Sequence, residues 1–156
     1  MNAREPLPGN PRATPAGLGM TPASCEAAAM TWFADLTPYS YGPSREDPKP
    51  LNVGWLSINQ PFPTGATSVE FQRRLRKLCA RPADIGFVCM GPHSCEWCVP
   101  ALRAKGVTVF ANGEKATGEI RVRGPRGTYA APTMIIHYVT AHGYLPPPEF
   151  IEAVLA

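Results

Sequence analysis

The chain has 156 residues, of which 44% are hydrophobic and 17% charged, and its formal net charge is +3. This length and composition predict one domain with a buried core, and so weak a charge does not by itself indicate nucleic-acid binding. No run of about 18 apolar residues is present, which excludes a membrane-spanning helix.

The first 29 residues differ in composition from the rest of the chain. They contain five prolines and no aromatic residue, Val or Ile, so they bury too little apolar surface to offset the entropy lost on folding. We expect residues 1–29 to be a disordered leader and residues 30–156 to be the single domain, with either Met1 or Met30 as the true start. An odd number of cysteines and no signal-peptide pattern favour a reducing cytoplasm over a disulfide framework.

Short strands are predicted where apolar and β-branched residues run between prolines and glycines. They cover residues 31–41, 52–57, 85–90, 107–111 and 119–123. The last of these alternates apolar and charged side chains, which is typical of a half-exposed strand. Residues 112–113 (Asn-Gly) strongly indicate a hairpin turn, and residues 125–127 (Pro-Arg-Gly) indicate a second turn.

The first predicted helix has a capping box at its start. Thr67 is expected at the N-cap and Glu70 three positions later, and the helix is expected to run to about Cys79. Its apolar residues recur at the spacing of one helical face. Those expected to face the core are Phe71, Leu75 and Leu78.

Two more helices are predicted near the C-terminus. Pro132 suits the first position of one helix, which is expected to run to about His142 with Gly143 at C′. Three prolines, residues 146–148, begin the last helix. Its expected core residues are Phe150, Ile151, Val154 and Leu155.

Cys95 and Cys98 carry the clearest chemical signal. A Cys-x-x-Cys pair has the spacing of a zinc knuckle, in which two thiolates bind one tetrahedral ion at about 2.3 Å each. Two further ligands must come from elsewhere. Treble-clef zinc domains have a knuckle, then a hairpin, then a helix, and here that helix would carry His137 and His142. On an ideal helix, however, residues at this spacing would point their rings roughly 140° apart. The pair therefore requires the helix to distort near its end, where Gly143 stands.

Other ligand sets and other roles remain open. An alternative quartet takes His93, Cys95 and Cys98 with Cys89 or His137. The histidines could instead be a helix cap and a half-buried core residue. The thiols could be a redox pair or inert, but a thioredoxin-like pair opens a helix within a βαβ unit, and that pattern is missing around this one.

Signatures of a catalytic zinc are missing from the sequence. Zinc deaminases need His-x-Glu before Pro-Cys-x-x-Cys, and many metalloproteases need His-Glu-x-x-His; neither pattern occurs. Glu96 inside the knuckle could act as a base, but a solvated surface residue is the favoured interpretation. Asp35 could be an active-site carboxylate, but a hydrogen bond to the backbone of a following turn is favoured.

Basic and aromatic residues could together contact a nucleic acid, but this interpretation is not favoured. Two separately solvated basic faces and a set of core aromatics are the expected arrangement. The basic residues are Arg73, Arg74, Arg76 and Lys77 in the first helix and Arg121, Arg123 and Arg126 around the later turn; the aromatic residues are Trp32, Tyr41 and Trp55.

Several motifs together resemble an uncharacterised family of small bacterial proteins, a domain of unknown function common in actinobacteria. The matching stretches, which begin at Trp32 and leave out the leader, are WFADLTPY (32–39), NVGWL (52–56), PFPTG (61–65), HSCEWC (93–98), EIRV (119–122), YAAP (129–132), HYVTAHGY (137–144) and PP (146–147). The resemblance implies no established activity. It implies a pattern in which His93, Cys95, Cys98, His137 and His142 take part and to which Cys89 does not belong, which favours a metal site.

The sequence as a whole predicts an α+β fold with short antiparallel strands, a capped helix and a treble-clef-like C-terminal half. The expected function is a non-enzymatic binding or adaptor module with one structural Zn2+ and an unidentified protein partner, in the cytoplasm and not in a membrane. The alternatives are a zinc-dependent hydrolase and a redox switch at the Cys-x-x-Cys pair.

Overall fold

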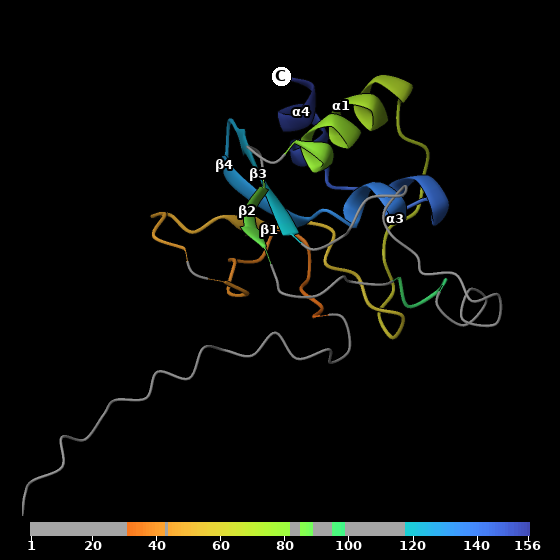
Figure 1. The fold of residues 1–156 in the computed structure, drawn as a ribbon, viewed down its shortest axis with the longest axis horizontal. Helices are drawn as coiled ribbons and strands as arrows, with labels where there is room; N and C mark the ends of the chain where they lie inside the picture. Colours follow the sequence, from red (N-terminus) through yellow and green to blue (C-terminus); the bar gives the residue numbers. More distant parts are fainter. Residues whose placement is uncertain (1–30, 43, 82–84, 89–94, 99–117) are drawn as a thin grey trace, which may run out of the picture.

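The computed structural model describes residues 31–42, 44–81, 85–88, 95–98 and 118–156, and these form an α+β fold (Figure 1). No helix within these residues is long and apolar enough to cross a membrane. The elements in chain order are β1 (Leu51–Asn52), α1 (Val69–Ala80), β2 (Ile85–Val88), β3 (Gly118–Gly124), β4 (Gly127–Pro132), α3 (Ile135–Ala141) and α4 (Pro148–Leu155).

The strands form one mixed sheet in the order β1-β4-β3-β2. β3 and β4 are an antiparallel hairpin in which Gly124 pairs with Gly127, so the turn predicted at residues 125–127 is confirmed. β2 pairs antiparallel with β3. β1 pairs parallel with β4, and the prediction of antiparallel strands alone is therefore wrong at this edge.

The two faces of the hairpin have different environments. Ile120 and Val122 on β3 and Tyr129 on β4 are buried in the main core, which α1 and α4 cover from one side (Figure 1). Ala130 points the other way and packs with Trp55 in a second, smaller cluster. This period-2 alternation follows from strand geometry and explains the alternating pattern predicted for residues 119–123.

Ser68, rather than the predicted Thr67, caps α1. The Ser68 Oγ accepts a hydrogen bond from the Phe71 N–H at 3.1 Å, which satisfies one of the N–H groups that a helix start leaves unpaired. The Thr67 hydroxyl instead accepts from the Gln72 side chain at 3.1 Å. Thr67 and Ser68 are adjacent hydroxyl residues that can both cap a helix, so the sequence pattern alone does not distinguish them.

The helix layer is held by large apolar side chains. The Phe150 ring on α4 packs edge-on against Phe71 on α1 and Tyr129 on β4, with centroids 6.4 and 5.8 Å apart. A Cβ added at Gly124 would lie 2.7 Å from the Ala153 Cβ, so the end of the hairpin and α4 approach closely. Of the remaining predicted core residues in these two helices, Leu75 and Val154 are buried, and Leu78, Ile151 and Leu155 are partly buried.

The strand predicted over residues 31–41 is not formed. Leu36 has a positive φ of 62°, a left-handed conformation that ends an extended run, and only an isolated bridge joins Pro38 to Leu51. The next predicted strand, 52–57, shortens to β1 at Leu51–Asn52. The apolar residues that suggested strands instead cover the second face of the sheet, where Tyr39 and Trp55 are buried.

Other boundaries also differ from the predictions. Pro132 is the last residue of β4 rather than the start of a helix, because Thr133 continues toward β3 and donates to the Gly118 carbonyl through its N–H at 2.8 Å and its hydroxyl at 3.1 Å. α3 then begins at Ile135. The predicted leader, the strand at residues 107–111 and the turn at residues 112–113 lie outside the described residues.

Candidate metal centre

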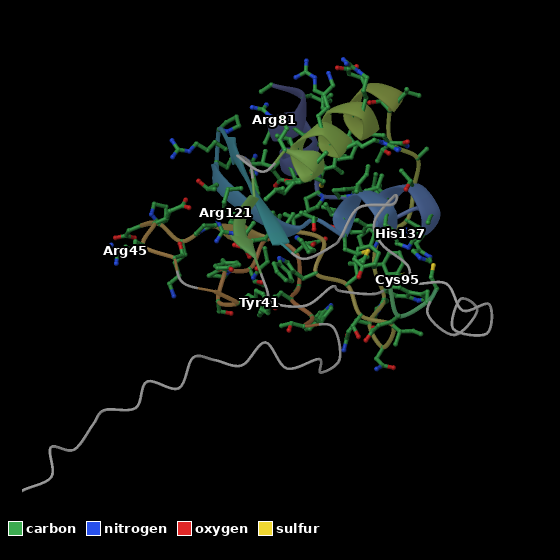
Figure 2. All side chains as sticks on the ribbon, viewed as in Figure 1. Tyr41, Arg45, Arg81, Cys95, Arg121 and His137 are labelled. Atoms are coloured by element: carbon green, nitrogen blue, oxygen red, sulfur yellow. The ribbon has the colours of Figure 1, made fainter. Side chains whose placement is uncertain are left out.

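Cys95, Cys98, His137 and His142 lie together, and each offers one ligand atom within 4.8 Å of the other three. Figure 2 places Cys95 beside His137 at the α3 end of the molecule, away from Tyr41 and Arg121. The two histidine Nε2 atoms are 3.3 Å apart. The Nε2 of His142 is 3.2 Å from the Cys95 Sγ and 3.5 Å from the Cys98 Sγ, and the Nε2 of His137 is 3.5 Å from the Cys98 Sγ.

The end of α3 brings the two histidines together. The helix ends at Ala141, and His142 takes the C-cap position with non-helical φ −115° and ψ 1°. Gly143 follows with φ +65°, as predicted for C′, and the Tyr144 N–H donates to the Tyr138 carbonyl at 3.1 Å. A glycine at C′ adopts this left-handed conformation without a Cβ clash. The helix therefore ends just before His142, which is the departure from ideal helix that the predicted His137–His142 pair requires.

The segment carrying the cysteines is a tight turn tied to a distant loop. The Cys98 N–H donates to the Cys95 carbonyl at 3.1 Å. The Glu96 carboxylate accepts from the Ile58 backbone N–H at 2.7 Å. Glu96 is therefore an anchor between residues 95–98 and the loop after β1, a role that neither sequence interpretation of this residue included.

Burial shifts the pKa values of Cys95 and of both histidines. It raises the pKa of the buried Cys95 thiol to about 11, although backbone hydrogen bonds from Cys98 and Trp97 offset part of the rise. Burial lowers the pKa of His137, and the neighbouring His142 lowers it further; burial also lowers the pKa of His142. Neutral imidazoles can bind a metal ion directly, whereas the thiols must lose their protons to do so.

Aromatic side chains lie beside the group, and the sequence did not predict them. The Trp97 ring lies 5.3 Å from the His142 ring and 5.8 Å from Tyr138, between centroids. On its other side Trp97 meets Phe62 edge-on at 5.5 Å. The available signal was the position of Trp97 between the two cysteines, which keeps its backbone next to the ligands.

The other candidate residues do not join this group in the described structure. His93 and Cys89 lie outside the described residues. Cys79 is buried in the core on α1. Asp35 accepts from the Gly54 N–H at 2.9 Å and from the Tyr144 hydroxyl at 2.7 Å, so it links distant segments instead of serving the turn that follows it.

The basic residues are partly neutralised by nearby acids. Arg73 and Arg74 pair with Glu70 at 2.7 and 2.8 Å, and Arg126 pairs with Glu149 at 3.1 Å. The Arg121 guanidinium lies 2.7 Å from the Glu119 carboxylate and 4.2 Å above the Tyr39 ring. Arg73, Arg74 and Arg126 are exposed, as expected for solvated faces, whereas Arg121 and its partner Glu119 are largely buried, so the prediction of a solvated face is wrong at Arg121. These local pairings give no basis for a phosphate-binding surface.

The fold and the site together define a small α+β domain with a Cys2His2 group that could hold a metal ion. The family described as "Domain of unknown function (DUF7919)" matches residues 31–155, and the chain belongs to this family. The match supports the resemblance inferred from the motifs. Comparison with curated proteins and with solved structures finds no match.

Proposed function

We propose that this domain binds one structural Zn2+ through Cys95, Cys98, His137 and His142 and acts as a non-enzymatic binding or adaptor module. The observation that carries the proposal is the spacing of the four ligand atoms. Tetrahedral zinc with Zn–N near 2.05 Å and Zn–S near 2.3 Å requires separations of about 3.3 Å between two nitrogens and about 3.6 Å between nitrogen and sulfur. Here the nitrogen–nitrogen separation is 3.3 Å, three of the nitrogen–sulfur separations are 3.2–3.5 Å, and all four ligand atoms lie within 4.8 Å of one another.

The chemistry of the donors favours zinc among the common ions. Two thiolates and two imidazoles suit Zn2+, whereas Mg2+ and Ca2+ select oxygen ligands. A bound cation would also remove the electrostatic difficulty at Cys95, because metal coordination deprotonates a thiol that burial otherwise keeps protonated. A quartet of protein ligands leaves no open position for water, which favours a structural role over a hydrolytic one.

The position of the site supports a role in holding the fold together. A metal ion there would join residues 95–98 to α3 and, through Glu96, to the backbone at Ile58. These segments are far apart in sequence. Because such a site does not exist in an unfolded chain, the free energy of metal binding becomes part of the free energy of folding.

The test is the metal content of the untagged full-length protein purified without chelators. We expect about one zinc per chain by mass spectrometry, lost in Cys95→Ser and His137→Ala. Cys79→Ala is the matched control, because Cys79 is buried but lies on α1 outside the group. No metal in the wild type, or equal metal in wild type and Cys95→Ser, would refute the proposal.

Cobalt substitution separates the structural proposal from the hydrolase and redox alternatives. Four protein ligands predict tetrahedral Co2+ with thiolate charge-transfer absorption that does not change when small anions are added. An anion-dependent spectrum would indicate an open coordination position and favour the enzyme. A metal-free protein that reversibly forms a Cys95–Cys98 disulfide would favour the redox switch.

A further inference from the structure

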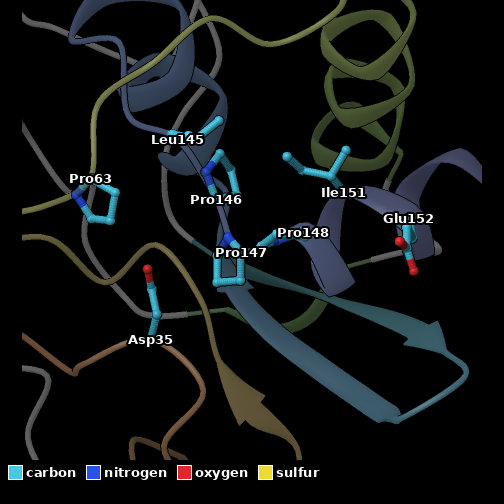
Figure 3. Close-up of a pocket in the computed structure, with 8 residues that line it drawn as sticks. All are labelled: Asp35, Pro63, Leu145, Pro146, Pro147, Pro148, Ile151 and Glu152. Carbon is cyan, nitrogen blue, oxygen red and sulfur yellow. The ribbon is translucent and has the colours of Figure 1, made fainter.

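A pocket of about 440 Å³ lies outside the metal centre, on the side of the molecule where the chain enters α4 (Figure 3). Its lining is largely apolar: Pro63, Leu145, Ile151 and three consecutive prolines, residues 146–148. The volume falls within the range of pockets that bind small molecules, and such pockets are typically apolar with a few polar groups that orient the ligand.

The segments that form the pocket are fixed by backbone hydrogen bonds. The Leu145 N–H donates to the Pro63 carbonyl at 2.9 Å, and the Gly65 N–H donates to the Gly143 carbonyl at 2.9 Å. The prolines have fixed φ angles and no N–H donors. The apolar walls are therefore preorganised, which reduces the entropy cost of binding.

Two carboxylates give the pocket a charge. Asp35 and Glu152 line it at opposite ends of the apolar surface, and the Asp35 carboxylate points toward Pro63 and the proline run in Figure 3. None of the described residues that line it is basic. The pocket thus combines an apolar surface with two acidic side chains. An apolar ligand body would fit the first, and a positively charged group would pair with the second.

Asp35 has the capacity to receive such a cation. Its carboxylate accepts one hydrogen bond at each oxygen, from the Gly54 N–H and the Tyr144 hydroxyl, and an ionised carboxylate has about four acceptor positions. These two donors hold the group in a fixed orientation. Burial raises the pKa of Asp35, and a cation paired with it would stabilise the ionised form.

We propose that this pocket binds a small organic cation, with an aromatic or aliphatic body against the proline rings and an ammonium or amidinium group paired with Asp35. A charge-assisted hydrogen bond to Asp35 supplies orientation, and burial of the apolar body supplies most of the affinity. Glu152 is exposed and adds a weaker, long-range attraction. This inference does not depend on the identity of the ion at the metal centre.

The test uses the full-length, metal-replete protein with 2-phenylethylammonium as the probe. Amide chemical shifts of Leu145 and Ile151 are followed by NMR while the probe is added. We expect saturable shifts with a Kd of about 1 mM, typical of a ligand of this size. The neutral analogue 2-phenylethanol and the anionic analogue 3-phenylpropionate are expected to bind at least about tenfold more weakly.

Two variants locate the binding site. Asp35→Asn should weaken binding of the ammonium probe about tenfold while leaving binding of 2-phenylethanol unchanged. Glu149→Gln is the matched control, because Glu149 lies on α4, pairs with Arg126 and does not line the pocket; its Kd should equal that of the wild type. The probe series on the wild type keeps the proposal testable if Asp35→Asn fails to fold.

Three results would overturn the proposal. Equal affinity for the neutral and cationic probes would refute charge selection, and the absence of saturable shifts would refute the pocket as a binding site. Binding of N-acetyl-lysinamide with no binding of 2-phenylethylammonium would assign the pocket to a basic side chain of a partner protein instead of a small molecule.

Discussion

The layer formed by the sheet, α1 and α4 is held together differently from the region formed by α3 and residues 95–98. In the first, buried apolar side chains such as Phe71, Tyr129 and Phe150 pack in direct contact. In the second, four ligand atoms converge beside the Trp97 and Tyr138 rings. The first region gains stability chiefly from buried apolar contacts together with its sheet and helix hydrogen bonds. The second brings together polar ligand groups whose burial would be favoured by a shared metal ion.

The difference shows which region would gain most from a bound metal ion. Apolar contacts in the helix layer need no bound ion, because burial of apolar surface is favourable in itself. At the metal centre, two histidines with lowered pKa values and a thiol with a raised one lie close together, and their mutual proximity is favourable when a cation binds them. We therefore expect the two regions to respond differently to the same perturbations.

Metal removal should have the largest effect. Structural zinc contributes about 10–16 kcal/mol of apparent binding free energy in zinc-finger peptides, so chelation should greatly destabilise the region that contains α3. Hydrogen exchange measured with and without a strong chelator should show large loss of protection in residues 135–142 and smaller loss in α1 and α4. Equal loss everywhere would mean that the two regions unfold as one unit, and no loss would contradict a structural metal.

Phe150→Ala should produce the next largest loss of stability, in the layer formed by the sheet, α1 and α4. Removing a fully buried ring that contacts both α1 and β4 should cost about 3–5 kcal/mol. Urea unfolding measures this loss. The folded variant should bind as much metal as the wild type, because the described ring contacts of Phe150 are with Phe71 and Tyr129 and not with the metal centre. A variant that is fully folded but has lost metal would contradict the separation of the two regions.

Gly54→Ala tests the junction between α3 and the loop after β1. Gly54 has φ +74°, and an added Cβ would lie 2.7 Å from the Ile135 Cδ1; strain and overlap together should cost about 2–3 kcal/mol. Gly143→Ala is the matched comparison. It has φ +65° but no atom within 4 Å of the added Cβ, so it should cost only about 1–2 kcal/mol. Equal losses in thermal unfolding would contradict the close contact at Ile135.

The smallest effect should be the pH dependence that Asp35 contributes. Burial raises its pKa, with hydrogen bonds from Gly54 and Tyr144 partly offsetting the rise. A raised carboxyl pKa contributes stability that is fully present below the ordinary value of 3.8 and is lost as pH rises through the folded-state pKa. The stability of wild type relative to Asp35→Asn should therefore fall over that interval and then level off. If the stability of wild type relative to Asp35→Asn instead rises with pH, the pKa of Asp35 is lowered by folding and the prediction is wrong.

The local patterns predicted local structure well. The turn at residues 125–127 and the role of Gly143 are present as predicted. Ile120 and Val122 face the core as the alternation predicts, but Glu119, on the face expected to be exposed, is buried. These features depend on strand period and glycine conformation, which neighbouring residues determine. The strand predicted at residues 31–41 was wrong because its aromatic residues pack on the far face of the sheet as an irregular segment, and apolar composition alone does not distinguish the two arrangements.

For the site, the sequence supplied the residue types and spacing but not the choice among ligand sets. The sequence left His93, Cys89 and both C-terminal histidines as alternatives, and the described structure brings His137 and His142 to Cys95 and Cys98. That convergence depends on where α3 ends, which is a tertiary property. The Glu96 anchor and the pocket were not predicted, because each depends on contacts between segments far apart in the chain.

The contact between Trp97 and His142 places an intrinsic fluorophore beside the proposed metal centre. The sequence contains three tryptophans; Trp32 is exposed and Trp55 lies in the cluster with Tyr39, while Trp97 lies 5.3 Å from the His142 ring. Binding of an ion at these residues should therefore alter the emission of Trp97 more than that of the other two indoles, and comparison with Trp97→Phe isolates its share. The proposed uptake and release of an ion could then be timed in solution without any attached dye.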